Sequence, residues 1–240
     1  KYADGYIVLS HYLKNYLINT VKVNKKIYLL PNLVNPVEFR TSLNKEIFMP
    51  NYTTIGYIGT PSVKDGIHDL IDAFKLVHQN NRNTHLLIIG DIPHGLSILP
   101  DLKKRVSLLN IDNNVTFTGL VPQLRASELL NSCQILALTR RNTIVSKAGF
   151  PTKLGEYFAC KKPVILTKVG DFEYYFKDNI HVKFAEQGNI ESIADAILDL
   201  IQNKEKQNLL AENAYHWMMT QLNYKAKASE INSFLDVVNQ

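Results

Sequence analysis

Short apolar runs recur along the chain, spaced so that a helix fits between most of them. They are rich in β-branched residues, and several are apolar almost throughout, which is typical of parallel strands buried on both faces of a sheet. The runs that we expect to form strands are residues 6–9, 27–30, 53–58, 85–89, 115–118, 135–138, 164–167 and 181–184.

The segments between these runs have the periodicity of amphipathic helices. The clearest extends from Ile67 to about Asn80 and keeps its apolar side chains on one stripe. Another begins after Asn189, a residue type that suits a helix N-cap. The strand pattern ends near Glu186, and two or three helices follow. This alternation predicts an α/β fold, a doubly wound parallel sheet of Rossmann-like type with C-terminal helices.

Residues 32–50 resemble a linker, because prolines and several asparagines cluster there. We therefore expect residues 1–35 to be the remnant of the end of an N-terminal domain plus the start of the linker. Residues 36–220 would form the Rossmann-like domain. Residues 221–240 would be a helix that crosses to a domain missing from this chain.

Composition and charge narrow the class of protein. The chain is 45% hydrophobic and 20% charged, which is typical of a globular protein. The net charge of +5 favours anionic partners, but no aromatic-interleaved basic stripe supports nucleic-acid binding. A peripheral contact with an anionic membrane stays open. No apolar run approaches the roughly 18 residues of a membrane span, so we expect a soluble, cytoplasmic protein.

The sequence shows no pattern typical of a metal site or a reactive thiol. Cys133 and Cys160 are isolated and show no CxxC spacing, which favours inert core thiols. The seven histidines are scattered, with no HExxH pattern, so no metal site is expected. The absence of a Gly-x-Ser-x-Gly elbow disfavours an α/β-hydrolase.

A glycine-containing turn joins the strand at 53–58 to the helix that begins at Ile67. Open α/β sheets bind ligands at the carboxyl ends of their strands, where helix N-termini present N–H groups with partial positive charge. Gly59 would permit close approach, and Lys64 could place an ammonium group against a diphosphate. The segment is neither a Walker A loop nor a GxGxxG motif. A plain glycine turn with a surface lysine is the alternative.

A second segment, residues 148–164, has the sequence of a turn, a short helix and a strand. Gly149 and Pro151 predict a tight turn, and Thr152 predicts the N-cap of the helix. We expect the N–H groups of residues 149–154 to line an anion pocket that Lys153 reinforces.

Glu156 lies one turn into this short helix. Its carboxylate can accept hydrogen bonds from both hydroxyls of a vicinal diol, the geometry that a ribose presents. An ordinary helix start with an exposed glutamate is the alternative.

Other candidate residues have simpler interpretations. Three aspartates at the start of the helix at Ile67 are expected to cap and solvate it, and an aromatic triplet is expected to pack in the core. Gly170 and Asp171, at a strand end, could face a ligand. The aspartates are Asp65, Asp69 and Asp72, and the triplet is Tyr174, Tyr175 and Phe176.

Four stretches of the chain, taken in order, resemble GT-B glycosyltransferases, in particular glycosyltransferase family 4 (glycosyl transferases group 1). Residues 4–10 with 29–34 resemble the passage out of the N-terminal domain of such enzymes, and residues 59–66 resemble their first phosphate loop. Residues 115–121 resemble the strand and loop beside the nucleotide base, and residues 148–164 resemble the Glu-x7-Glu region. The resemblance covers nearly the whole chain, and the last stretch is the most specific.

The resemblance implies the donor-binding half of an enzyme that transfers a sugar, with retention, from a nucleotide diphosphate sugar. Charge-assisted contacts would stabilise the departing nucleoside diphosphate. The implied diphosphate contacts are Gly59, Lys64, Gly149, Phe150, Pro151, Thr152, Lys153 and Leu154. Glu156 would bind the ribose, and Gly119, Leu120 and Val121 would lie near the base. No catalytic residue is assigned within this chain.

The resemblance also implies the partners. The donor is a substrate, and neither a cofactor nor a metal is expected; the absence of Asp-x-Asp argues against the metal-dependent GT-A class. A sugar or lipid-linked acceptor would bind through the missing N-terminal domain, so this chain alone should scarcely catalyse transfer. Bacterial surface polysaccharide synthesis, at the inner face of the plasma membrane, is a family-level expectation.

Two positions depart from the family pattern. Thr60 stands near the place where the family often has an arginine, and Ala148 stands where the first glutamate of Glu-x7-Glu would fall. That glutamate normally contacts the donor sugar, so backbone N–H groups of residues 149–151 would have to take over the contact. A non-catalytic nucleotide-binding or regulatory module of the same fold is therefore one alternative. A sugar-nucleotide epimerase of GT-B shape is another.

Overall fold

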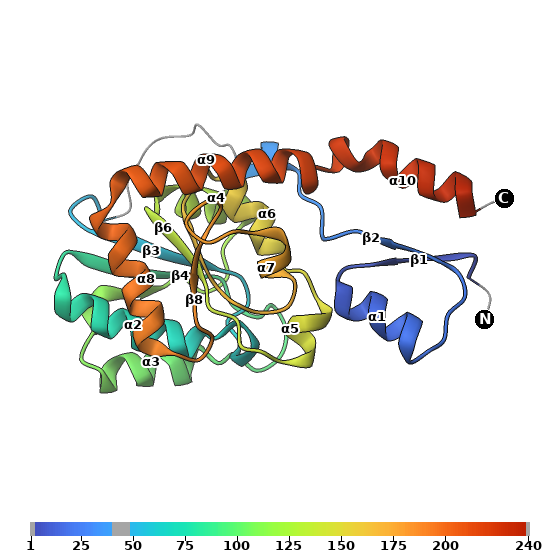
Figure 1. Cartoon of the computed structure of the whole chain (residues 1–240). Helices are drawn as coiled ribbons and strands as arrows, with labels where there is room; N and C mark the ends of the chain where they lie inside the picture. The colour runs from blue at the N-terminus through green and yellow to red at the C-terminus, as the bar shows by residue number, and fades with distance from the viewer. Residues whose placement is uncertain (1–2, 40–48, 239–240) are drawn as a thin grey trace.

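The structure, a computed structural model, describes residues 3–39 and 49–238 (Figure 1). Much of the expected linker, residues 40–48, lies outside the described residues. The main body is a six-stranded sheet in which all neighbours are parallel, in the order β5-β4-β3-β6-β7-β8. Its strands are β3 (Thr53–Ile58), β4 (Thr84–Ile89), β5 (Val115–Phe117), β6 (Ile135–Leu138), β7 (Val164–Thr167) and β8 (Lys183–Ala185). The predicted doubly wound parallel sheet is confirmed.

The strand order creates a crevice at one point of the sheet. From β3 the chain proceeds outward to β4 and β5, then returns to the other side of β3 and proceeds through β6 and β7 to β8. The connections leaving β3 and β6 therefore diverge at the carboxyl ends of these two adjacent strands. Open α/β sheets bind their ligands at such a topological switch point.

Helices flank the sheet and bury it. Helix α2 packs against α8, and α6 packs against α9. Every residue of β4, β6 and β7 is buried, because helices cover both faces of a parallel sheet. The helices of this body are α2 (Ile67–Asn80), α3 (Leu99–Leu108), α4 (Gln123–Ser132), α5 (Ile144–Ala148), α6 (Thr152–Ala159), α7 (Phe172–Tyr175), α8 (Ile190–Gln202) and α9 (Lys204–Gln221).

The first two strands form a separate unit beside the main body. β1 (Gly5–Val8) and β2 (Lys26–Leu29) pair in parallel, with α1 (His11–Asn19) between them in sequence. Helix α10 (Tyr224–Val238) extends over this unit (Figure 1). The rings of Tyr28 and Phe234 lie 5.3 Å apart, and the Tyr28 hydroxyl donates to Glu230 over 2.9 Å.

Two chain segments connect the units and pair with each other. The amide of Val34 donates to the carbonyl of Leu222 over 2.8 Å, and the amide of Tyr224 donates back to Val34 over 3.3 Å. The Val34 side chain packs where Gly155 of α6 leaves room for it. This junction lies next to the segment in which we expect the ligand site.

Several local predictions were wrong. Pro151, not Thr152, is the N-cap residue of α6, and Thr152 is exposed inside the first turn. The last strand is Lys183–Ala185 and not residues 181–184. Tyr174 is 71% exposed, although Phe176 is buried as expected. The Tyr174 ring lies outside the core and contacts the ring of His11 in α1, with the two centroids 4.2 Å apart.

Candidate functional site

Three glycines stand side by side at the carboxyl ends of β3, β4 and β5. Gly59 donates its amide to Ile89 over 2.9 Å, and Gly90 donates to the carbonyl of Gly119 over 3.1 Å. A Cβ on Gly90 would lie 2.8 Å from the carbonyl oxygen of Gly59, and Gly90 has a φ of 105°. A side chain is therefore excluded at Gly90, and we call the three residues the glycine ledge. Sequence reasoning missed Gly90, although a glycine directly after a buried strand was its signal.

The expected base-proximal residues lie at the far end of this ledge. A Cβ added to Gly119 would meet no atom within 4 Å, so open space adjoins it. Leu120 is 59% exposed, and Val121 packs against the core. Open space at Gly119 next to an exposed leucine suits a planar ring.

A buried group of charged residues lies at the switch point. Lys153 of α6 forms an ion pair with Asp65, and its ammonium also donates to the Tyr57 hydroxyl over 2.9 Å. The Tyr57 hydroxyl donates to Asp65 Oδ2 over 2.9 Å, and Arg140 Nε donates to Asp65 Oδ1 over 3.1 Å. We call Tyr57, Asp65, Arg140 and Lys153 the switch-point cluster.

Burial makes the charges of this cluster depend on one another. Tyr57, Asp65 and Arg140 are buried, and the Lys153 side chain is 15% exposed. Burial alone would raise the pKa of Asp65, but the charges of Lys153 and Arg140 outweigh it and hold that pKa below its ordinary value. One carboxylate thus faces two cations, and the cluster has a net positive charge.

The interpretation of the aspartates as solvated capping residues was wrong. Asp65 and Asp69 are buried, and all three aspartates form ion pairs: Asp65 with Arg140 and Lys153, Asp69 with Arg141, and Asp72 with Arg105. Their arginine and lysine partners lie at least 33 residues away in sequence, so local pattern could not reveal them.

Gly59 makes room for Lys153. A Cβ at Gly59 would collide with the Lys153 side chain, and Gly59 has a φ of 119°, which favours glycine. Lys64 is exposed, and its carbonyl accepts a bond from the Arg141 amide over 3.1 Å. Lys64 lies near enough for its charge to act on Lys153, but it is not part of the switch-point cluster.

The turn before α6 offers fewer amides than expected. Gly149 donates to Val145 over 3.2 Å, Leu154 donates to Pro151 over 3.2 Å, and Pro151 has no amide hydrogen. The amides of Phe150, Thr152 and Lys153 have no acceptor among the described residues. The side chains of Phe150 and Leu154 are buried in the core, so these residues can offer a ligand only backbone atoms. Three amides thus remain, those of Thr152 and Lys153 in the first turn of α6 and that of Phe150 just before it.

Glu156 lies one turn after Lys153 on the same face of α6, because residues three apart in a helix are neighbours. Burial raises its pKa, Lys153 partly offsets that rise, and Glu38 adds to it. The carboxylate forms no hydrogen bond or ion pair with the described residues. Glu156 therefore offers two free acceptor oxygens beside the positive cluster.

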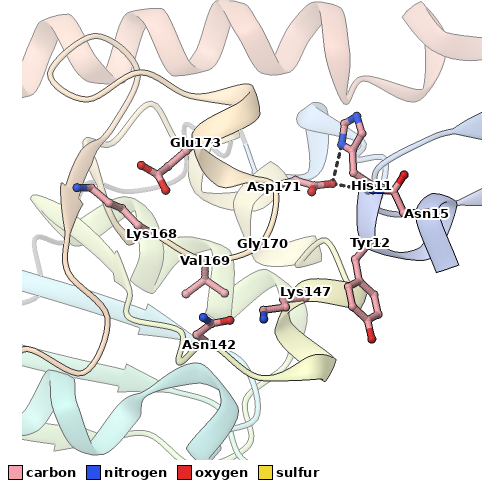
Figure 2. A pocket seen from close by; sticks show the side chains of 10 residues that line it. All are labelled: His11, Tyr12, Asn15, Asn142, Lys147, Lys168, Val169, Gly170, Asp171 and Glu173. Carbon is pink, nitrogen blue, oxygen red and sulfur yellow. Dashed lines mark hydrogen bonds and ion pairs between the residues drawn. The ribbon is translucent and has the colours of Figure 1, made fainter. Parts of the chain in front are cut away.

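A polar pocket of about 400 Å³ lies between α1 and the main body (Figure 2). Residues of α1, α5 and the β7–α7 connection line this α1 pocket, including His11, Lys147 and Asp171. Asp171 Oδ2 accepts the His11 amide over 2.8 Å and contacts His11 Nδ1 at 3.1 Å. Figure 2 shows Lys147 and Asn142 pointing toward one another across the pocket.

Residues before the main body also hold the loop at 148–151, which lies between the α1 pocket and the switch-point cluster. The Ser10 hydroxyl donates to the carbonyl of Ala148 over 2.9 Å, and the Asn32 amide group donates to the carbonyl of Phe150. Both bonds occupy carbonyl oxygens of the loop and leave the Phe150 amide without a described acceptor. The α1 pocket, this loop and the switch-point cluster therefore follow one another along the carboxyl edge of the sheet.

The described residues contain neither a metal-binding cluster nor a membrane-spanning helix. No group of three or more His, Cys, Asp or Glu side chains that could hold a metal ion occurs in residues 3–39 and 49–238. Within those ranges, no helix combines the length and the apolar character needed to span a bilayer.

Comparison with known proteins gives a consistent result. The family model for glycosyl transferases group 1 matches residues 39–217. The chain is 28% identical over 216 residues to glycosyltransferase MJ1178 of Methanocaldococcus jannaschii, an alignment that covers 88% of this chain and 53% of that protein. It is also 28% identical over 218 residues to the N-acetyl-alpha-D-glucosaminyl L-malate synthase of Bacillus anthracis, with 88% and 54% covered.

The fold is similar to that of Anabaena HepE, whose structure was solved in complex with UDP. The TM-score is 0.84 at 20% identity, and 96% of this chain and 63% of HepE are covered. The chain spans just over half the length of the curated relatives it matches. By its family match the chain belongs to the glycosyl transferases group 1, and its fold is that of the C-terminal half of a GT-B glycosyltransferase.

Proposed function

We propose that this chain is the donor-binding half of a retaining glycosyltransferase that takes a sugar from a nucleotide diphosphate sugar. The observation that carries the proposal is the switch-point cluster. It has a net positive charge, it adjoins free amides at the N-terminus of α6, and the unpaired carboxylate of Glu156 lies one turn away. An anion binder next to a diol binder matches the chemistry of a nucleoside diphosphate.

The order of these groups along the sheet edge suggests the pose that we propose for the donor. The base would lie on the glycine ledge near Gly119–Val121, and the ribose hydroxyls would donate to Glu156. The diphosphate would contact Lys153 and the amides of Thr152 and Lys153, with Lys64 as an outer cation. The sugar would then extend past Gly149–Pro151 toward the α1 pocket.

The proposed chemistry uses charge and no metal. As the bond from the sugar to the diphosphate breaks, negative charge grows on the leaving oxygen, and preorganised cations and amides stabilise it most at that moment. Ala148 supplies no carboxylate to the donor sugar, so the free Phe150 amide is the contact available there. HepE was crystallised with UDP, which supports a nucleotide ligand for this fold.

We propose further that a sugar or lipid-linked acceptor binds through a second domain and enters near the α1 pocket. Synthesis of bacterial surface polysaccharide at the membrane face is compatible with the net charge of +5. A non-catalytic nucleotide-binding module is the second candidate, and the alanine at position 148 favours it.

Titration calorimetry of this chain with UDP, GDP and ADP tests the donor proposal. We expect one nucleoside diphosphate to bind with a dissociation constant between about 1 μM and 1 mM, and the Lys153→Met variant to lose most of that affinity. Absence of binding by all three would contradict the proposal.

A transfer assay on the full-length protein separates the glycosyltransferase from both alternatives. A glycosyltransferase releases nucleoside diphosphate from its donor only when an acceptor is present. A regulatory module binds the nucleotide but releases none under any acceptor condition, and an epimerase changes the sugar without an acceptor.

A further inference from the structure

Arg140 combines deep burial with incomplete pairing. It follows β6 directly at the switch point, and it is only 5% exposed. Of its guanidinium nitrogens, Nε donates to Asp65 over 3.1 Å. Nη1 is enclosed and has no hydrogen-bond partner. Nη2, which also has no partner among the described residues, is not enclosed. Unpaired buried donors are rare in folded proteins and call for a specific explanation.

The backbone around Arg140 is fixed on both sides. The Thr167 hydroxyl donates to the Arg140 carbonyl over 2.6 Å, and the Thr139 hydroxyl donates to the Gly66 carbonyl over 2.9 Å. The guanidinium is therefore held in position before any ligand arrives. A guanidinium nitrogen held in place and open on one side is a suitable donor to a phosphate oxygen.

The charges of the switch-point cluster also favour an anionic ligand. Asp65 carries one negative charge and bridges two cations, Lys153 and Arg140. Whichever cation Asp65 neutralises, the other one keeps its charge within a buried cluster. Burying an unneutralised charge is costly, so an external anion is expected to complete the cluster.

We propose that Arg140 is a second phosphate-binding cation of the donor site, and that Asp65 positions Arg140 and Lys153 relative to each other. The inference deepens the proposed function and rests on it. In this arrangement Lys153 and the α6 amides bind one phosphate of the nucleoside diphosphate, and the open Nη2 of Arg140 donates to the other. The site therefore favours nucleoside diphosphates over monophosphates.

A purely structural role for Arg140 is the competing explanation. In that case the Arg140–Asp65 pair would only tie β6 to the loop before α2, and its loss would lower stability without changing ligand affinity. The neighbouring residue offers a matched control. Arg141 also pairs with a buried aspartate, Asp69, but it is half exposed and outside the switch-point cluster.

The experiment compares Arg140→Met with Arg141→Met, since both variants lose one positive charge from the same segment. Calorimetry with UDP, GDP and ADP gives affinities, and thermal unfolding without nucleotide gives stability. We expect Arg140→Met to weaken diphosphate binding roughly 10- to 100-fold, as befits a lost charge-assisted hydrogen bond. Arg141→Met should stay within about twofold of the wild type.

The outcomes separate this inference from the proposed function. If the wild-type chain binds no nucleoside diphosphate, both fail. If the wild type binds and the two variants bind equally well, Arg140 is structural and only this inference is overturned.

A second variant keeps the test decisive should Arg140→Met not fold. Arg140→Lys keeps the charge but loses the guanidinium, so the ratio of UDP to UMP affinity should fall at least severalfold. An unchanged ratio in a folded Arg140→Lys variant overturns the inference.

Discussion

The switch-point cluster and the α1 pocket lie on the same edge of the sheet but satisfy their charges in different ways. In the switch-point cluster, Asp65 is buried and binds the side chains of Tyr57, Arg140 and Lys153. In the α1 pocket, the His11 side chain is 31% exposed and its partner Asp171 is 12% exposed. Water can replace a lost partner of His11 in the pocket, whereas it does not reach Asp65, which is 2% exposed.

The difference separates two requirements of the proposed enzyme. A nucleoside diphosphate is a constant ligand, and a rigid, buried group can be preorganised for it. An acceptor would be the variable partner, and an open polar pocket tolerates change. Substitutions should therefore be severe at the cluster and mild at the pocket.

The largest effect is expected for Gly66→Ala. Gly66 has a φ of 66°, and a Cβ there would collide with the Thr139 carbonyl at the end of β6. We expect a loss of about 5 kcal/mol in the free energy of unfolding, since strain and a backbone clash combine. Gly119→Ala is the control, because its φ of 63° is similar but its Cβ would meet nothing. Urea denaturation should show a loss of only about 1 kcal/mol for the control; equal losses would contradict the clash.

The second effect concerns Asp65→Asn, which leaves two buried cations without a counter-charge. We expect a loss of about 3 kcal/mol in unfolding free energy, as for other broken buried pairs. Glu212→Gln, which breaks the exposed pair with Lys161, should cost less than about 1 kcal/mol. A loss for Asp65→Asn no larger than that for Glu212→Gln would show that the cluster is not a buried pair.

Acid provides an independent check on Asp65. Its pKa lies below the ordinary value of 3.8 in the folded chain, so its carboxylate stabilises the fold above that pH. This stabilisation is lost as the pH falls from 3.8 through the lower folded-state pKa. The wild type should therefore lose its stability advantage over Asp65→Asn in that range. A constant difference would contradict the pKa shift.

A third effect is expected at Glu156, with opposite signs for stability and binding. Burial raises the pKa of Glu156, so the fold favours its protonated form and the ionised form costs stability at neutral pH. Glu156→Gln should therefore raise the unfolding midpoint at pH 7, and this gain should shrink as the pH falls toward 4.5, the ordinary pKa of the group. Affinity for the nucleoside diphosphate should drop about tenfold, as for the loss of hydrogen bonds to a charged acceptor. A Glu156→Gln variant that loses stability and keeps its nucleotide affinity would contradict the assignment of Glu156 as the ribose-binding carboxylate.

The smallest effect is expected at the α1 pocket. Asp171→Asn keeps one oxygen for the His11 amide, and water can reach the rest of the pair. We expect a change below about 1 kcal/mol in unfolding free energy and nucleoside diphosphate affinity within twofold of the wild type. A large loss of affinity would mean that the diphosphate binds at the pocket instead of the cluster.

Features encoded locally were predictable from the sequence. The apolar runs identified the six strands of the main sheet within a few residues, because parallel strands buried on both faces leave a continuous signal. That Lys153 and Glu156 lie on the same helix face was predictable, because residues three apart in a helix are neighbours.

Features that depend on distant residues were not predictable in this way. Asp65 looked like a helix-capping aspartate, and only the fold brings Arg140 to it from 75 positions away. Gly59 was expected to admit a phosphate, whereas the structure fills that space with Lys153. Thr152 is a residue type that suits an N-cap. Pro151 takes that position instead, because its backbone is extended and the helix begins at Thr152.

A crystal structure of this chain with UDP, or with whichever nucleoside diphosphate binds most tightly, tests the central claim most directly. The account predicts phosphate oxygens within hydrogen-bond distance of Lys153 Nζ and the α6 amides, and ribose hydroxyls on the carboxylate of Glu156. A nucleotide seated elsewhere, with its diphosphate away from Lys153 and its ribose away from Glu156, would contradict it.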